Sequence, residues 1–288
     1  MTNVKSQRLS KTARKRLVDA VYYLMFAVIT LFFIFPLLWV LSLSLKDVPE
    51  LFASPPLLFP TDPKFENYAY VFERTPVGRY LANSLLIVLS TIALVLLVAI
   101  PSAYAFSRMN FRYKRTALLL VLVFQMVSPV VVAIPLYRVF AQVDLLNSYG
   151  SLIVVYVAIG LPVATWFLRG YFDSIPRELD ESATLDGCNR LQLLLKILLP
   201  LAAPGIASVA ILVGVQSWSQ FVIPFILLDD REMFPVSVGI INLQSTSEAI
   251  TTHYLAAASL ISVLPIIVIF VLLQRFIVGA LTSGAVKG

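Results

Sequence analysis

The residues whose types and spacing could support chemistry are concentrated in one segment, residues 176–200, which reads PRELDESATLDGCNRLQLLLKILLP. It opens with three carboxylates, Glu178, Asp180 and Glu181, which suit charged contacts rather than catalysis. His253 is the only histidine and Cys188 the only cysteine, which argues against a multi-histidine metal site, a Ser-His pair or a disulfide framework. No nucleophile, base and orienting group converge elsewhere, so an enzyme is not expected.

Two short helices are predicted to position these residues. Pro176 suits a first helical turn, and the acidic residues that follow favour the positive end of the helix dipole. Gly187 fits the end of this helix at about residue 186. A second helix is expected from about Asn189, with an apolar face and a polar stripe at helical spacing. The apolar face comprises Leu191, Leu194, Leu195 and Leu198, and the stripe Asn189, Gln192 and Lys196. Pro200 and Pro204 are expected to break or kink the chain as it re-enters the membrane.

The composition around this segment is that of a protein embedded in a membrane. Apolar residues make up 59% of the 288 residues and charged residues only 13%. Six stretches are long and apolar enough to span a bilayer as helices, because lipid offers no partner for an unpaired peptide group. They cover about residues 20–45, 82–107, 116–137, 150–171, 203–228 and 254–274. We therefore expect an all-α integral membrane protein with six transmembrane helices.

The distribution of Lys and Arg predicts the orientation. Sixteen of the 22 basic residues flank alternate ends of these stretches, including the N-terminal run and the 176–200 segment. By the positive-inside rule, both termini and this segment are cytoplasmic. The rule also accounts for the net charge of +6 without a nucleic-acid partner. The expected organisation is a basic cytoplasmic tail (1–19), a six-span domain (20–278) and a cytoplasmic C-terminal tail (279–288). His253 is interpreted as a surface residue at a helix end.

One pattern within the segment is more specific than its composition. Glu181, Ser182 and Ala183 are followed after three residues by Gly187, and after nine more by Ile197, with Leu199-Pro200 one residue beyond. This resembles the EAA loop of ABC-importer permeases, in which Glu-Ala-Ala, Gly, Ile and Leu-Pro have these spacings. Ser182 replaces the second alanine of that pattern and is small enough to preserve close packing.

The resemblance implies a role for the loop, here residues 172–202. The first short helix would be a coupling helix, lying between spans four and five, that docks on a separate ATPase. Glu178 and Glu181 would form its charged rim, Ser182 and Ala183 would allow close approach, and Gly187 would permit the sharp turn. Ile197, Leu199 and Pro200 complete the motif. The sequence contains no Gly-x-x-x-x-Gly-Lys-Ser/Thr phosphate loop, so ATP and Mg²⁺ would be used by the partner rather than by this chain.

The overall resemblance extends from about residue 20 and is to the maltose-type, binding-protein-dependent carbohydrate importers. It rests on Asn83-Ser84, on Ser102 to Ala105, and on the ending GALTSGAVKG. It implies a heteromeric complex in a bacterial or archaeal cytoplasmic membrane: two ATPase subunits, a second and usually different permease, an extracytoplasmic solute-binding protein and a sugar. Alternatives are an importer of a non-sugar solute and a self-contained secondary transporter. The latter usually places an ionisable group deep in a span, and none is evident here.

A sugar pathway needs neutral hydrogen-bonding and aromatic side chains at membrane depth. The candidates are Asn83, Gln125, Tyr156, Gln216, Trp218 and Gln220. Such amides could instead only join helix to helix. Trp166, near a span end, is interpreted as an interface anchor.

The extracytoplasmic loops are expected to meet the solute-binding protein. Residues 46–80 contain six prolines and predict an irregular excursion, whereas residues 229–253 predict a short helix or re-entrant turn. By the resemblance, this second loop would reach into the binding protein through Asn242, Leu243, Gln244 and Ser245.

Overall fold

The computed structural model describes residues 3–245 and 252–285. The regular elements in these ranges are all helices, which confirms the all-α class. The chain divides into two compact units. The first comprises residues 1–71 and 250–260, and the second comprises residues 72–249 and 261–288.

The first unit contains α1 (Asn3–Ser44) and α2 (Val48–Leu51). Two further helices start in it and continue into the second unit: α3 (Glu66–Arg74) and α14 (Thr252–Ala285). The basic residues of the predicted tail lie on the same helix as the first apolar stretch, because α1 is continuous from Asn3.

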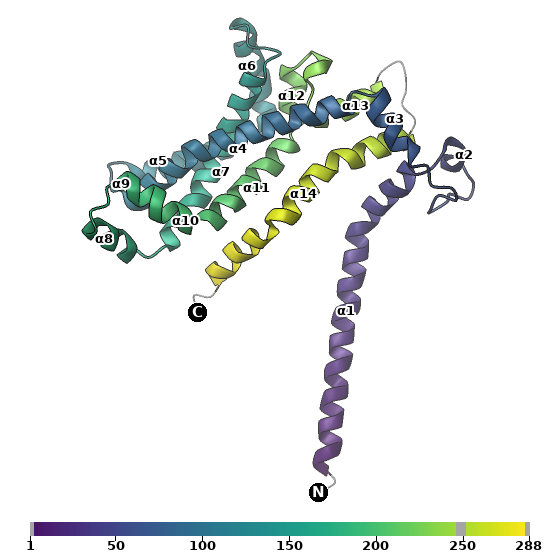
Figure 1. The fold of residues 1–288 in the computed structure, drawn as a ribbon, viewed down its shortest axis with the longest axis horizontal. Coiled ribbons are helices and arrows are strands. Elements are labelled where there is room, and N and C mark those ends of the chain that lie inside the picture. Colours follow the sequence, from purple (N-terminus) through teal and green to yellow (C-terminus); the bar gives the residue numbers. More distant parts are fainter. Residues whose placement is uncertain (1–2, 246–251, 286–288) are drawn as a thin grey trace. The chain divides into compact units, whose positions relative to one another are not determined.

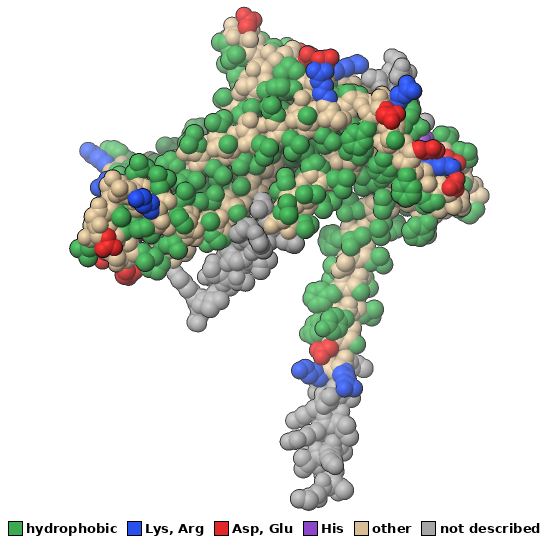
Figure 2. All heavy atoms as spheres, viewed as in Figure 1, with side chains coloured by type: hydrophobic (Ala, Val, Ile, Leu, Met, Phe, Trp, Pro, Cys, Tyr) green, Lys and Arg blue, Asp and Glu red, His purple; other side chains and the backbone are tan. Residues whose placement is uncertain are grey.

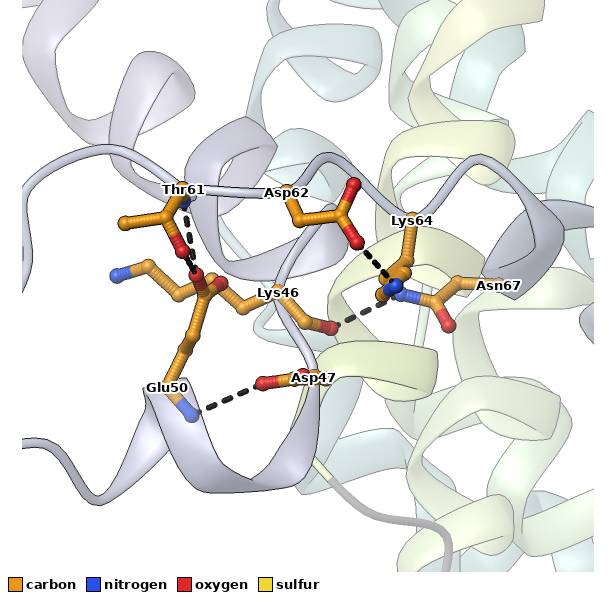
Figure 3. A network of polar contacts seen from close by, with 7 residues as sticks. All are labelled: Lys46, Asp47, Glu50, Thr61, Asp62, Lys64 and Asn67. Atoms are coloured by element: carbon orange, nitrogen blue, oxygen red, sulfur yellow. Dashed lines mark hydrogen bonds and ion pairs between the residues drawn. The ribbon is translucent and has the colours of Figure 1, made fainter.

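A network of polar contacts organises the proline-rich part of this unit (Figure 3). The Asn67 side-chain amide donates to the carbonyl oxygen of Lys46 at 3.0 Å. The Asp47 carboxylate accepts from the Glu50 amide at 3.0 Å and so caps α2. The Glu50 carboxylate in turn accepts from the Thr61 amide at 2.8 Å. These side chains satisfy backbone groups that the irregular chain cannot pair. The predicted irregular structure is found between α2 and α3, whereas α3 and the start of α4 make the rest of the 46–80 segment helical.

The second unit is built on three long helices, α4 (Val77–Arg108), α7 (Tyr149–Ser174) and α11 (Ala203–Trp218), which pack against one another (Figure 1). Small residues let them approach closely: a side chain in place of Gly205 on α11 would meet the Tyr171 ring of α7 at 2.6 Å. The shared core consists of Val95, Ala99, Ala103, Tyr104, Ala164, Leu168, Phe172, Ile175, Ala183, Leu193, Leu194, Leu198, Ala202, Val209 and Val213.

Shorter helices complete this unit. They are α5 (Lys114–Gln125), α6 (Pro129–Gln142), α8 (Glu178–Leu185), α9 (Arg190–Gln192), the π-helix η1 (Leu193–Leu198), α10 (Leu199–Leu201), α12 (Val222–Leu227), the 3₁₀ helix η2 (Arg231–Met233) and α13 (Val236–Ser245). In Figure 1, α8 and α9 lie beyond one end of α4 and α11.

Four helical segments in the described residues are long and apolar enough to cross a membrane: 18–44, 77–108, 149–174 and 252–272. Two bent pairs raise the number to six if each is one span. The expected third span, 116–137, is two helices, α5 and α6, that meet at 93°. The residues between them include Ser128, which precedes Pro129, and a residue before proline avoids helical geometry.

The expected fifth span, 203–228, also needs correction. Its helix α11 ends at Trp218, and α12 begins only at Val222. At its other end, α11 makes a 76° bend with the helical stretch 190–201. The bend falls where Pro200 and Pro204 were expected to break the chain, because proline removes a backbone donor.

The surface of the described residues is largely apolar (Figure 2). Large exposed hydrophobic side chains run along most of the long helices, whereas charged side chains gather near helix ends. Contiguous apolar surface of this extent is not found on soluble monomers. Together with the span-length helices, it identifies a multi-pass membrane protein.

His253 corrects one interpretation made from the sequence. It lies at the start of α14, as a helix-end residue, but it is buried and not on the surface. Its ring packs against Tyr254 at a centroid distance of 4.0 Å. The apolar residues that follow in α14 bring this first turn into the packed part of the first unit, which the polarity of His253 did not indicate.

Candidate functional site

The short charged helix predicted from the sequence is α8, which begins two residues later and ends one residue earlier than expected. Pro176 lies before the helix and not in its first turn, so that part of the prediction is wrong. The helix begins at Glu178, with all three carboxylates in its first turn, and ends at Leu185. Gly187 adopts a left-handed conformation with φ of +85°. Its amide donates to the Thr184 carbonyl at 3.1 Å, and the Cys188 amide donates to the Ala183 carbonyl at 3.0 Å. This pair of bonds is the Schellman motif, which ends a helix and reverses the chain through a glycine.

The residues of α8 divide between two faces. Glu178, Glu181, Ser182 and Leu185 follow the i, i+3, i+4, i+7 spacing of one helical face, and all four are exposed. Leu185 is 89% exposed, so its apolar side chain is left largely uncovered by the described residues. On the opposite side, Ala183 is 3% exposed and belongs to the core. The motif residues therefore lie on both faces of α8, and Ala183 packs within the chain.

The exposed face is neutral apart from its two carboxylates. The Ser182 hydroxyl donates to the Glu178 carbonyl at 2.8 Å, so its hydrogen bond is made within the helix. A serine in this position leaves no unsatisfied donor on the face, consistent with the expectation that it can replace alanine there.

An ion pair connects α8 to the end of α4. Arg108 Nε lies 2.7 Å from Asp180 Oδ2, and the two side chains are only 6% and 18% exposed. The same guanidinium donates through Nη2 to the Ile175 carbonyl at 2.9 Å. Next to it, the Ser107 hydroxyl donates to Asp173 at 2.6 Å. The last turn of α4 thus contacts both α8 and the end of α7, so α8 is connected to two long helices.

The second helical stretch begins at the residue predicted from the sequence. The Asn189 side chain accepts from the Gln192 amide at 2.9 Å, and the Gln192 side chain accepts from the Asn189 amide at 3.0 Å. This is a reciprocal capping box. Asn189 and Gln192, read from the sequence as a polar stripe, therefore stabilise the start of the helix.

The apolar face of this stretch differs from the prediction. Leu194 and Leu198 are buried as expected, but Leu191 and Leu195 are exposed and Leu193 is buried instead. The cause is the π-helical geometry of η1, whose wider turn rotates the inward face away from α-helical spacing.

The remaining motif residues lie around this turn. Ile197 is half-buried against the core, Leu199 is half-buried, and Pro200 is exposed at the start of the bend into α11. They lie in the connection between α8 and α11.

The pathway candidates are not brought together as one set. Asn83 donates to the carbonyl oxygens of Glu232 and Phe234 at 2.8 and 3.0 Å, which ties α4 to η2. Gln125 is exposed at the end of α5, whereas Tyr156 is buried in α7.

The other three candidates share the end of α11. Trp218 is buried, and Gln216 and Gln220 are half-buried on either side of it. The Gln220 carbonyl accepts from the Ser237 hydroxyl at 2.6 Å, which links this end of α11 to α13.

The predicted docking residues lie at the end of α13, which provides the short helix expected in the 229–253 loop. Asn242 is half-buried and Leu243 is buried, so Leu243 packs within the unit. The side chains of Gln244 and Ser245, and residues 246–251, lie outside the described residues.

Two residues important in this geometry were missed from the sequence. Arg108 was counted only as a basic residue near a span end, although it holds α8 in place. Leu185 was not singled out, although a leucine at i+7 from Glu178 in a charged helix was a visible signal.

Comparison with known proteins gives concordant matches along most of the chain. Residues 96–282 match the family model described as "Binding-protein-dependent transport system inner membrane component". A sulfoquinovosyl glycerol transport system permease protein of Agrobacterium fabrum is 34% identical over 255 residues, covering 88% of this chain and 89% of the relative. A maltodextrin transport system permease protein of Streptococcus pneumoniae is 32% identical over 276 residues, covering 96% and 98%.

The fold agrees with this. A crystal structure of a bacterial ABC transporter involved in the import of the acidic polysaccharide alginate superimposes with a TM-score of 0.76 at 21% identity, covering 90% of this chain and 96% of that chain. The helical architecture, the geometry of the 172–202 segment and the extent of these matches lead to one conclusion: the chain belongs to the family of binding-protein-dependent transport permeases of the inner membrane.

Proposed function

We propose that this chain is a membrane-spanning subunit of an ATP-driven importer that carries a sugar, an oligosaccharide or a related polyol or glycoside. The observation that carries the proposal is the division of α8 into an exposed face and a face held in the core. Because the chain belongs to a family of transport permeases, we interpret this geometry as part of a permease. The relatives named for sulfoquinovosyl glycerol and maltodextrin support a carbohydrate as the solute.

In this proposal, α8 is the coupling helix. Its face of Glu178, Glu181, Ser182 and Leu185 docks in a groove on a separate ATPase subunit, which binds ATP and Mg²⁺. The Arg108–Asp180 pair and the buried Ala183 then turn a movement of the ATPase into a rigid-body movement of α4 and α7. We place the 172–202 segment and both termini in the cytoplasm, because the sequence has basic residues in or beside each of them.

The complete importer would contain two ATPase subunits, a second permease and an extracytoplasmic solute-binding protein. Gln216, Trp218 and Gln220 remain our candidates for contacts with the sugar, because they gather at one end of α11. Asn242 and the residues after it remain candidates for contact with the binding protein.

The proposal is tested by purifying the chain from gently solubilised native membranes and identifying the subunits that accompany it. We expect an ATPase with a phosphate-binding loop, a second permease and a solute-binding protein. Glu181→Lys combined with Gly187→Pro should lose the ATPase, whereas Thr184→Lys, which places a positive charge on the flank of α8, should retain it. The recovered binding protein is then screened for thermal stabilisation by a panel of sugars. Isolation of the chain without an ATPase would contradict the importer, and stabilisation only by amino acids or peptides would contradict the sugar.

A further inference from the structure

A cavity of about 540 Å³ lies between α5 and α7, apart from the exposed face of α8. Three of the residues that line it are cations: Lys114 and Arg115 from the first turn of α5, and Arg169 from α7. The other lining residues are apolar or aromatic, namely Leu118, Leu119 and Trp166. A cavity with basic and apolar walls fits an amphipathic ligand that has an anionic group and a hydrocarbon part.

The cations of α5 are not explained by the stability of that helix. Lys114 and Arg115 occupy its first two positions, where the dipole disfavours positive charge, and its first turn contains no acidic residue. The preceding Tyr113 has a left-handed φ of 66° and its side chain does not cap the helix. An anion in the cavity would offset both the clustered charge and the uncapped end.

The contacts of these cations leave donors for a ligand. Lys114 Nζ donates to the Met109 carbonyl at 3.0 Å, whereas Arg115 makes no hydrogen bond or ion pair within the described residues. Arg169 Nε lies 3.3 Å from Asp173 Oδ2, and the guanidinium stacks over the Trp166 ring at 5.4 Å. This arrangement fixes the plane of Arg169, while its two terminal nitrogens have no partner in the described residues. Of the three cations that line the cavity, only Arg169 has a carboxylate partner within the described residues.

The apolar wall indicates that the anion is part of a lipid rather than a soluble ion. Leu119 is 56% exposed, and Val123, one helical turn further along α5, is 57% exposed. Acyl chains can follow this apolar strip from the cavity towards the middle of the membrane. Trp166 is 40% exposed at the level of the cations, as expected for an aromatic residue at the membrane interface.

We propose that this cavity binds the head group of an anionic phospholipid, with the phosphate between Arg115 and Arg169 and the acyl chains along α5. The site requires only that the chain lies in a bilayer, so it does not depend on which solute is carried. Basic residues at the end of a membrane helix attract anionic lipids in general. The cavity would add a defined binding position for one such lipid.

The test is lipid binding to the purified full-length protein in detergent, measured by native mass spectrometry with phosphatidylglycerol and phosphatidylcholine. We expect one tightly retained phosphatidylglycerol. Arg115→Gln should weaken its binding about fivefold, as expected for one cation near the lipid surface, and adding Arg169→Gln should weaken it by roughly a further fivefold. Arg115 is exposed and makes no hydrogen bond or ion pair within the described residues, so the single variant reports on binding even if the double variant is unstable.

The matched control is Arg112→Gln, which removes the same charge from the loop just before α5, outside the cavity. Arg112 packs over the Tyr113 ring and does not line the cavity. Equal weakening by Arg112→Gln and Arg115→Gln would overturn the proposal in favour of general charge attraction. Equal retention of phosphatidylcholine would overturn the requirement for an anion, and displacement of the lipid by millimolar inorganic phosphate would assign the cavity to a soluble anion.

Discussion

The 172–202 segment and the end of α11 show two uses of polar residues in a membrane protein. In the segment, the polar side chains of the caps and of the exposed face of α8, and Asp180 in its ion pair with Arg108, each have a definable structural task. At the end of α11, Gln216 and Gln220 flank a buried tryptophan, and the same groups could bind a solute or only hold helices together. The difference shows that a residue spacing imposed by backbone geometry can be interpreted from the sequence. The presence of an amide within a span, in contrast, does not by itself indicate its role.

The largest effect is expected from a substitution that breaks the connection between α8 and α4. Arg108→Met removes one partner of a nearly buried ion pair and leaves the Asp180 carboxylate without it. We expect a loss of about 3 kcal/mol in stability. Thermal unfolding of the purified complex measures this loss. The double variant Arg108→Met with Asp180→Leu should recover most of it, and failure to recover any would show that the ion pair is not the cause.

A smaller effect tests the turn that follows α8. Gly187→Ala forces a side chain into a left-handed conformation at a cost of about 1–2 kcal/mol. The matched control is Gly170→Ala in α7, where a side chain meets no atom within 4 Å and alanine is the better helix former. We expect opposite changes in melting temperature from the same chemical substitution. A change of the same sign at both positions would contradict the assigned role of Gly187.

Asn83 bears directly on this comparison, because it is both a pathway candidate and a residue whose hydrogen bonds join α4 to the η2 region. Asn83→Ala removes two hydrogen bonds to the η2 region and should cost about 1–3 kcal/mol in stability. If its amide is fully occupied in this way, the KM for transported sugar in proteoliposomes should not change. A raised KM with unchanged stability would place Asn83 in the pathway instead.

The smallest effect concerns the network in the first unit. Donation from the Thr61 hydroxyl and amide lowers the pKa of the Glu50 carboxyl below its ordinary value. Since the folded pKa is the lower one, the contribution of Glu50 is present above the ordinary pKa and is lost as pH falls through the folded value. A nitroxide label at the exposed Phe59 position should become more mobile between pH 6 and pH 3. In Glu50→Gln this pH dependence should disappear, and its persistence would assign it to another group.

Much of the fold could be predicted because its signals are local. Apolar length predicted the helical class, and Gly187, Asn189 and the prolines at 200 and 204 predicted a stop, a start and a bend that the structure confirms. Each of these signals reflects a conformational requirement of the backbone at one position. The break between α5 and α6 was missed because the stretch around Pro129 is as apolar as the spans themselves, so length alone indicated a single span.

The parts that could not be predicted depend on contacts distant in the sequence. Arg108 and Asp180 are 72 positions apart, and nothing near either residue indicates the pairing. Burial of Ala183 and exposure of Leu185 depend on which side of α8 meets the core. The rotation of the leucine face follows from the π-helical turn, which requires the packing around Leu193 and Leu198 and has no signature in the spacing.

The most direct test of the central claim compares adjacent substitutions on the two sides of α8. Leu185→Asp places a carboxylate in the middle of the proposed docking face, whereas Thr184→Asp places the same group on its flank. The measurement is ATPase activity stimulated by the solute-binding protein, with the complete complex in proteoliposomes. Strong loss of stimulation in Leu185→Asp with near-normal activity in Thr184→Asp is the predicted result. Normal stimulation in Leu185→Asp, or equal loss in both variants, would contradict the assignment of this face to the ATPase.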